Sequence, residues 1–215
     1  MTGGLPRIWI ITDPDHPDGP VAPIRRALRG CPPGLVGVQL RAKGVPDRQL
    51  VQWGRELRTA THATGSVLAV NRRADVAQIV DADGVHLPEL GLPLADLRQD
   101  WAALGMIGVS RHGRAGLDQA ERDGATYAFV SPIFHVPGKA QPIGIAGFRS
   151  AIAGVGIPTY ALGGIAAEDF KALRAAGAFG VAIRRAIYDA SQPEEALQGF
   201  VQCVRELDKS PPNVE

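Results

Sequence analysis

The stretch "VGVQLRAKGV" at residues 36–45 has the alternating pattern of a β-strand with two different faces. Successive side chains of a strand point to opposite sides, so every second residue lies on the same face. One face is therefore apolar and the other is polar. The polar face either meets water or lines a binding site, and the rest of the chain decides between these alternatives. The apolar residues are Val38, Leu40 and Ala42, and the polar residues are Gln39, Arg41 and Lys43.

Strands and helices alternate along the whole chain around this stretch. Eight short apolar runs suited to strands lie at residues 8–12, 37–41, 66–70, 84–87, 106–110, 127–131, 158–162 and 180–184. Amphipathic segments suited to helices lie at residues 47–63, 73–80, 94–104, 116–125, 168–178 and 193–208. Regular alternation indicates an α/β fold, a parallel sheet covered by helices. Eight such units predict a (β/α)₈ TIM barrel. An open doubly wound sheet is the structural alternative, and its dinucleotide-binding version is disfavoured because no G-x-G-x-x-G follows the first strand.

The composition is that of an ordinary globular protein, with 215 residues, 45% hydrophobic and 21% charged, and a formal net charge of +1. This charge gives no electrostatic reason to expect nucleic acid or a membrane as a partner. No apolar run approaches the roughly 20 residues that span a bilayer, and the first residues do not resemble a signal peptide. Cys31 and Cys203 lack a metal-binding spacing, which favours a reduced, cytoplasmic setting.

The domain organisation that we expect is a single barrel domain over residues 1–209, followed by a disordered tail at residues 210–215. No feature of the sequence decides the oligomeric state, so a homo-oligomer is left open.

The barrel answers the question raised by the opening stretch. Outward side chains of a barrel strand pack against helices, whereas inward side chains near the C-terminal end of a strand face the active site. We therefore predict that Gln39, Arg41 and Lys43 line the mouth of the barrel. Asn71 and Ser110 end the third and fifth strands, so we expect both beside them.

A glycine pair, Gly163 and Gly164, separates the seventh strand from the next helix. Backbone N–H groups of glycines can approach an anion closely, and a helix N-terminus adds a favourable dipole. Loops after strands seven and eight are the usual phosphate site of this barrel. The sequence therefore predicts a phosphate site here, with Arg184 as a further cationic contact and Arg185 as a solvated surface residue.

The Pro/Gly-rich segment "VSPIFHVPGK" at residues 130–139 follows the sixth strand and can close over the mouth. Its His135 is predicted to act as a general acid/base, because an imidazole can accept and return a proton near neutral pH, with Lys139 beside it. A solvent-exposed loop histidine is the alternative interpretation. His86, on the fourth strand, is interpreted as a packed core histidine.

Six motifs occur in the order and spacing of the thiamine-phosphate synthase family, whose superfamily also contains the TenI-type thiazole tautomerases. They are "VQLRAK", "VNRRAD", "DGVHLP", "IGVS", "YAFVSPIF…GK" and "IPTYALGGI…GAFGVAI". The resemblance runs from about residue 8 to residue 188. It implies the same barrel fold, and small phosphorylated pyrimidine and thiazole substrates.

The resemblance also implies roles for individual residues. The glycines matching Gly163 and Gly164, with the backbone around Ile183, hold the thiazole phosphate in the synthases. The aminopyrimidine and its diphosphate are held at the positions of Gln39, Arg41, Lys43, Asn71, Ser110 and Lys139.

Several positions depart from the synthase pattern. Arg72 and Gly91 stand where the family has the two aspartates that bind magnesium, and neither Asp75 nor Glu89 occupies a matching position. Magnesium prefers carboxylate oxygens and substrate phosphates, so we expect no magnesium site. Other replacements are Pro88 and Glu89 for Gly-Gln, Val136 and Gly138 for two threonines, and Arg184 for a serine.

The anion sites are kept and the metal ligands are lost, which favours a tautomerase-like reaction. That reaction moves a proton on a thiazole carboxylate phosphate and needs no metal cofactor. The tautomerase histidine is replaced by Pro132, so His135 would have to take its place. The alternative is thiamine-phosphate synthesis from hydroxymethylpyrimidine diphosphate and thiazole phosphate, with magnesium as cofactor. A third hypothesis is a binding protein for phosphorylated ligands without catalysis.

Overall fold

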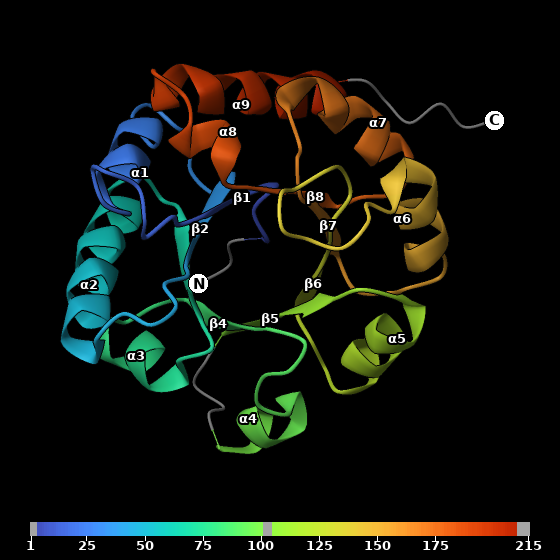
Figure 1. Cartoon of the computed structure of the whole chain (residues 1–215), viewed down its shortest axis with the longest axis horizontal. Coiled ribbons are helices and arrows are strands. Elements are labelled where there is room, and N and C mark those ends of the chain that lie inside the picture. The colour runs from blue at the N-terminus through green and yellow to red at the C-terminus, as the bar shows by residue number, and fades with distance from the viewer. Residues whose placement is uncertain (1–3, 101–104, 210–215) are drawn as a thin grey trace.

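The computed structural model describes residues 4–100 and 105–209 and shows eight parallel strands closed into a barrel in chain order (Figure 1). The predicted (β/α)₈ barrel is therefore confirmed. The predicted tail at 210–215 lies outside the described residues. The strands are β1 (Ile8–Ile11), β2 (Val36–Leu40), β3 (Val67–Asn71), β4 (Gly84–Leu87), β5 (Met106–Arg111), β6 (Tyr127–Val130), β7 (Thr159–Leu162) and β8 (Gly180–Ile183).

Helices surround the barrel, and most of the longer ones lie where the amphipathic pattern predicts them. Within the described residues no helix has the length and apolar character needed to cross a bilayer. The helices are α1 (Ala22–Ala27), α2 (Asp47–Ala63), α3 (Ala74–Ile79), α4 (Leu94–Asp100), α5 (Arg114–Arg122), α6 (Gly144–Ile152), α7 (Phe170–Ala175), α8 (Arg185–Tyr188) and α9 (Pro193–Lys209), with a 3₁₀ turn η1 (Ala167–Asp169) before α7.

Three helices are absent from the sequence prediction. Both α1 and α8 are short, with six and four residues, so neither displays a full amphipathic repeat. In α6, Gly144 and Gly147 interrupt the pattern, and the burial of Phe148 against the barrel supplies the stability that local propensity lacks.

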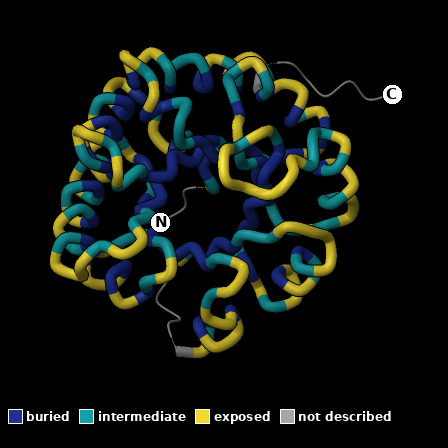
Figure 2. Tube along the Cα trace, viewed as in Figure 1, coloured by how far each residue is buried: buried dark blue, intermediate teal, exposed yellow. Residues whose placement is uncertain are grey.

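Two apolar cores follow from the alternation of side chains along the strands. The outer core packs strand residues such as Val38 and Leu40 against the helices. The inner core fills the barrel with a small aromatic cluster that includes Trp9, Tyr127 and Phe129. Figure 2 shows the buried strands at the centre and the exposed residues on the outer helices and loops. The orientation predicted for β2 is thus observed, because its apolar residues face outward.

The inner aromatic cluster closes the barrel below its C-terminal mouth. Trp9 stacks on Tyr127 with ring centroids 5.0 Å apart. Gly108 makes room for this cluster, since a Cβ atom there would lie 2.1 Å from the Tyr127 ring. The cavity described below therefore lies above this layer, at the C-terminal ends of the strands.

Candidate active site

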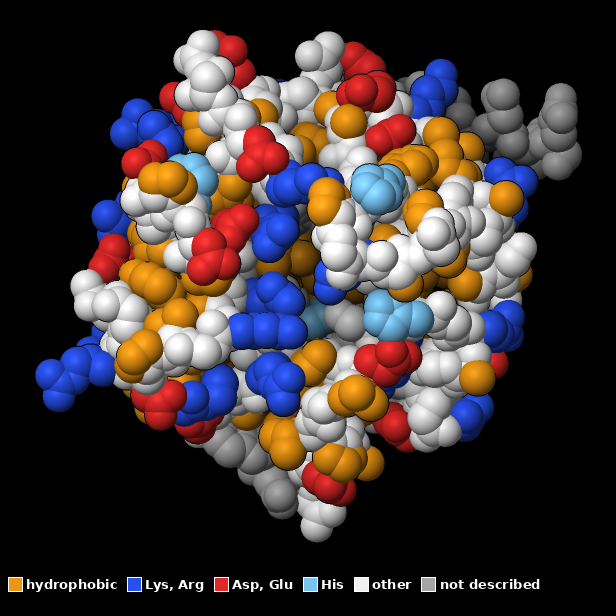
Figure 3. Space-filling model, viewed as in Figure 1, with side chains coloured by type: hydrophobic (Ala, Val, Ile, Leu, Met, Phe, Trp, Pro, Cys, Tyr) orange, Lys and Arg blue, Asp and Glu red, His pale blue; other side chains and the backbone are white. Residues whose placement is uncertain are grey.

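A cavity of about 570 Å³ opens at the C-terminal mouth of the barrel. Figure 3 shows Lys and Arg side chains gathered around a hollow on this face. Ten of the eleven residues predicted for the site line the cavity, so the fold brings together residues from six strand ends. They are Gln39, Arg41, Lys43, Asn71, Ser110, Lys139, Gly163, Gly164, Ile183 and Arg184.

Gln39 brings an unsatisfied hydrogen-bond donor to this cavity. Its side chain is 2% exposed, and its Nε2 atom is buried without a hydrogen-bond partner among the described residues. A buried amide N–H without an acceptor costs roughly 1–3 kcal/mol. A ligand acceptor placed against Gln39 would remove that cost.

Arg41 follows β2 and is held at its backbone. Its N–H donates to Thr12 Oγ1 over 2.8 Å, and Thr12 Oγ1 donates to the Arg41 carbonyl over 3.0 Å. Burial lowers the pKa of the Arg41 guanidinium, Arg184 lowers it further, and Asp13 opposes them. Arginine still stays charged in proteins, so the site holds a partly desolvated cation that an anion would stabilise.

The charge around the cavity is strongly positive. Six Lys and Arg residues line it, whereas the lining carboxylates are Glu89 and Asp189. Asp13 pairs with Arg184 over 3.6 Å. Such an excess of positive charge suits an anionic ligand and raises its local concentration. The six are Arg41, Lys43, Arg72, Lys139, Arg184 and Arg185. Arg185 was predicted to be a solvated surface residue, but it is half-buried and lines the cavity.

Ser110 reaches the cavity from β5 and is held from below. Its Oγ lies 2.8 Å from Nε2 of His86, which is 1% exposed on β4. The Nδ1 atom of His86 lies 3.3 Å from the hydroxyl of Tyr127. His86 is thus the packed core histidine that the sequence indicates, and it also supports a residue of the cavity.

Gly163 and Gly164 lie at the other side of the mouth and bring backbone N–H groups to the cavity. Their φ angles are 108° and 69°, conformations that favour glycine. Among the described residues, the N–H groups of Gly164 and Ile165 have no hydrogen-bond acceptor. Consecutive free N–H groups of this kind form a nest for an anion. The sequence suggested that the dipole of the following helix would also favour an anion. A 3₁₀ turn and the six-residue α7 follow instead of a long helix, so the N–H groups are the main attraction for an anion here.

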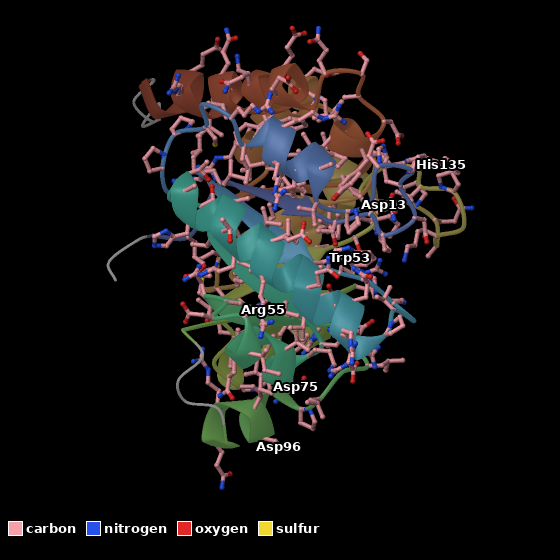
Figure 4. All side chains as sticks on the ribbon, turned by 90° about the vertical axis from the view of Figure 1, so that its left-hand side faces the viewer. Asp13, Trp53, Arg55, Asp75, Asp96 and His135 are labelled. Carbon is pink, nitrogen blue, oxygen red and sulfur yellow. The ribbon has the colours of Figure 1, made fainter. Side chains whose placement is uncertain are left out.

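The loop after β6 separates the two residues predicted to be catalytic. Its start is tied to β7, since Phe134 N–H donates to the Gly163 carbonyl over 3.0 Å. Lys139 lines the cavity, but His135 is exposed and does not. Figure 4 shows His135 at the outer edge of this loop. The solvent-exposed alternative therefore describes His135 better in this conformation.

His112 lines the cavity although it was not among the predicted site residues. Its Nδ1 donates to the Ser131 carbonyl over 2.6 Å, and its Nε2 lies 3.5 Å from a carboxylate oxygen of Glu89. The segment "GVSRH" could have indicated it, because His112 lies two residues after Ser110 and continues the same face of β5. This arrangement fixes an imidazole at the mouth beside a carboxylate.

The residues present do not match a magnesium site built on two neighbouring aspartates. Arg72 lines the cavity with a φ of 67°, and Gly91 does not line it. Glu89 and Asp189 follow β4 and β8, which lie on opposite sides of the eight-stranded barrel, so they do not form a pair for one small ion. No group of three or more His, Cys, Asp and Glu residues that could hold a metal occurs within 4–100 and 105–209.

Comparison with known proteins gives one consistent result. The family model described as thiamine monophosphate synthase matches residues 8–187. Thiamine-phosphate synthase of Chlorobium luteolum is 37% identical over 199 residues, 91% of this chain and 92% of that protein. The enzyme of that name from Chloroflexus aurantiacus is 36% identical over 208 residues, 93% and 94% of the two chains.

A solved structure agrees with these relatives. Thiamine phosphate pyrophosphorylase from Pyrococcus furiosus superposes with a TM-score of 0.85 at 31% identity, over 94% of this chain and 96% of that one. The family match and the identity to full-length relatives confirm the resemblance carried by the sequence motifs. This chain therefore belongs to the thiamine monophosphate synthase family.

Proposed function

We propose that the protein is a thiamine-phosphate synthase, which joins hydroxymethylpyrimidine diphosphate to thiazole phosphate and releases diphosphate. The comparisons favour this alternative over the tautomerase-like reaction expected from the sequence, because the full-length relatives carry the synthase name. One observation carries the proposal: a single cavity has two separate anion-binding regions, the cations after β2 and the free N–H groups after β7. Two phosphorylated substrates need two such regions.

The proposed mechanism uses each region for one substrate. The Gln39 amide donates to an acceptor of the pyrimidine ring, and Arg41 and Lys43 bind the diphosphate with Asn71, Ser110 and Lys139. The bond between the pyrimidine methylene carbon and the diphosphate oxygen breaks, and the thiazole nitrogen forms a bond to that carbon. Fixed cations stabilise the negative charge that develops on the departing diphosphate. The N–H groups at Gly164 hold the thiazole phosphate in line for this attack.

Arg72 is proposed to supply part of the charge that a carboxylate-bound metal supplies in the family pattern. Its left-handed backbone is uncommon for residues other than Gly, Asn, Asp and His, so replacing Arg72 by one of these residues would relieve backbone strain. The observed φ accommodates Asp well. Arg72→Asp is therefore a change that the fold can accept.

We expect the wild-type protein to keep its turnover within about threefold when EDTA removes divalent ions, because guanidinium groups replace metal charge. Arg72→Asp should lower metal-free turnover by about 10²-fold, the scale for losing one group that stabilises developing charge. Turnover of both proteins is measured with EDTA and with added magnesium. Arg72→Ala serves as the control, because it removes the positive charge without adding a carboxylate. Complete loss of wild-type turnover in EDTA would contradict the role given to Arg72.

The proposed function is tested by supplying both substrates and following thiamine phosphate by chromatography. Product formation that requires both substrates supports the proposal. Binding of both substrates without product would instead favour the non-catalytic alternative. Calorimetry with each substrate, in the absence and in the presence of the other, decides whether the two anion regions are independent.

A second candidate function is the tautomerase-like proton transfer, and His112 is the observation that favours it. The imidazole lies at the mouth with Nδ1 fixed on the Ser131 carbonyl, so Nε2 is directed to Glu89 and can exchange a proton with a bound ligand. This geometry suits His112 better than the exposed His135.

If the protein also isomerises a thiazole carboxylate phosphate, His112→Gln should slow that reaction by about 10²-fold, the usual scale for a general acid/base. The predicted catalytic residue His135 gives the matched control, since His135→Gln should change the rate by less than about twofold. Proton NMR of the two thiazole isomers measures both rates. A larger effect at His135 would return the catalytic role to that residue.

A further inference from the structure

A line of three hydrogen-bonding side chains runs from the closed interior of the barrel to the cavity. Tyr127 on β6 lies at the bottom, His86 on β4 in the middle, and Ser110 on β5 at the cavity. His86 also packs on Phe129 with ring centroids 4.4 Å apart, so the imidazole has a fixed orientation. The proposed mechanism uses Ser110 and leaves the other two polar groups without a task.

The protonation of the two buried groups is determined by their surroundings. Burial raises the pKa of the Tyr127 phenol well above its usual range, and neighbouring Tyr160 raises it further, so Tyr127 keeps its proton. Burial lowers the pKa of His86 to about 3, with Arg111 and Arg41 lowering it as well. At neutral pH the imidazole is therefore uncharged and carries one N–H, on either Nδ1 or Nε2.

Hydrogen-bond satisfaction selects between these tautomers. Among the described residues, His86 Nδ1 is the one acceptor within reach of the Tyr127 hydroxyl. A buried hydroxyl that cannot donate its proton is costly. Tyr127 therefore donates to Nδ1, which must be the unprotonated nitrogen. The imidazole proton then lies on Nε2 and is donated to Ser110 Oγ over 2.8 Å.

We propose that His86 is a positioning residue which, through its Nε2–H group, turns the Ser110 hydroxyl into a donor directed at the cavity. Since one lone pair of Ser110 Oγ accepts from His86, the hydroxyl proton is left for an acceptor oxygen of the bound diphosphate. The identity of that acceptor rests on the proposed function, whereas the tautomer does not. With the opposite tautomer, Ser110 would donate to His86 and present only lone pairs to an anion.

The tautomer is measured directly in the free protein. Two-bond ¹H–¹⁵N correlation spectra of ¹⁵N-histidine protein identify the protonated nitrogen of each histidine, and His86→Gln assigns the His86 signals by their loss. We expect Nε2–H for His86 at every pH between about 5.5 and 8.5, because the protein keeps the ring neutral in this range. A protonated Nδ1, or an imidazolium within this range, would overturn the proposal.

The effect on binding is measured by calorimetry with inorganic diphosphate. Ser110→Ala and His86→Leu should each weaken binding about tenfold, the loss of one hydrogen bond to a charged group. The double variant should bind no more weakly than either single variant, because both changes remove the same bond. His86→Gln, whose amide can donate where Nε2 stood, should stay within about threefold of wild type.

The outcomes separate this inference from the proposed function. Additive losses of affinity in the double variant would show a merely structural role for His86 and would overturn the proposal. Wild-type protein that does not bind diphosphate would also overturn it, because Ser110 would then have no diphosphate oxygen to donate to. If the tautomer and the non-additive losses are found but thiamine phosphate is not formed, the proposed function fails and the positioning role stands. Thermal unfolding of each variant checks that the fold is kept, and the NMR measurement holds even if His86→Leu does not fold.

Discussion

Replacing Arg41 by Met should lower kcat/KM for thiamine phosphate formation by about 10³-fold, the upper scale for removing one group that stabilises charge in a transition state. Met keeps most of the length of the side chain and removes the charge. The Arg41 backbone is tied to Thr12 by two hydrogen bonds, so the point at which this side chain leaves the strand end is fixed before substrate binds. Its partial burial strengthens an interaction with diphosphate relative to a solvent-exposed arginine.

Arg48→Met provides the matched control for this experiment. Arg48 is exposed on α2 and does not line the cavity, so its loss should leave kcat/KM within about twofold of wild type. Steady-state kinetics with both substrates varied gives the comparison. If Arg41→Met and Arg48→Met lose activity equally, the cations after β2 do not bind the diphosphate.

Replacing Gly164 by Val should weaken the binding of thiazole phosphate by about 10²-fold, because the side chain would block a backbone anion site. A Cβ atom at Gly164 would lie 2.9 Å from the His135 carbonyl oxygen and 2.9 Å from Phe134 Cβ. The φ of 69° adds roughly 1–3 kcal/mol of strain for a β-branched residue. We therefore also expect a lower unfolding temperature. Calorimetry with thiazole phosphate and thermal unfolding measure the two effects.

Gly19→Val separates strain from blocked binding. Gly19 has a φ of 71°, and a Cβ atom there would meet nothing within 4 Å. The backbone strain is thus similar, but the anion site is untouched. Gly19→Val should lower the unfolding temperature and leave thiazole phosphate affinity unchanged. Unchanged affinity in Gly164→Val would place the thiazole phosphate elsewhere.

Much of the fold follows from local patterns in the sequence. All eight strands lie within a residue or two of the apolar runs, because buried parallel strands are short, continuous and apolar. The amphipathic helix at 47–63 coincides with α2. By contrast, α1, α6 and α8 depend on tertiary packing, which for α1 and α8 is mainly against α9 and each other, and no local pattern reveals it.

The site was predictable where a strand fixes the direction of a side chain. Alternation along β2 places Gln39 inside the barrel, and the closed topology then brings Asn71 and Ser110 to the same cavity. The same rule extended by two residues would have found His112. His135 lies in a loop, where spacing in the sequence does not determine direction. The charge balance of the cavity also depends on tertiary structure, since Asp13 comes to Arg184 from the opposite end of the chain.

The central claim is that this cavity couples two phosphorylated substrates, and ³¹P NMR of the complete reaction tests it most directly. Wild-type protein is mixed with hydroxymethylpyrimidine diphosphate and thiazole phosphate, in one sample with EDTA and in a second with magnesium, and both spectra are followed over time. The account predicts that the ester diphosphate signals disappear while free diphosphate and thiamine phosphate appear in equal amounts, and that Arg41→Met slows both together. Diphosphate release without thiamine phosphate, or no reaction of either substrate in both samples, would contradict it.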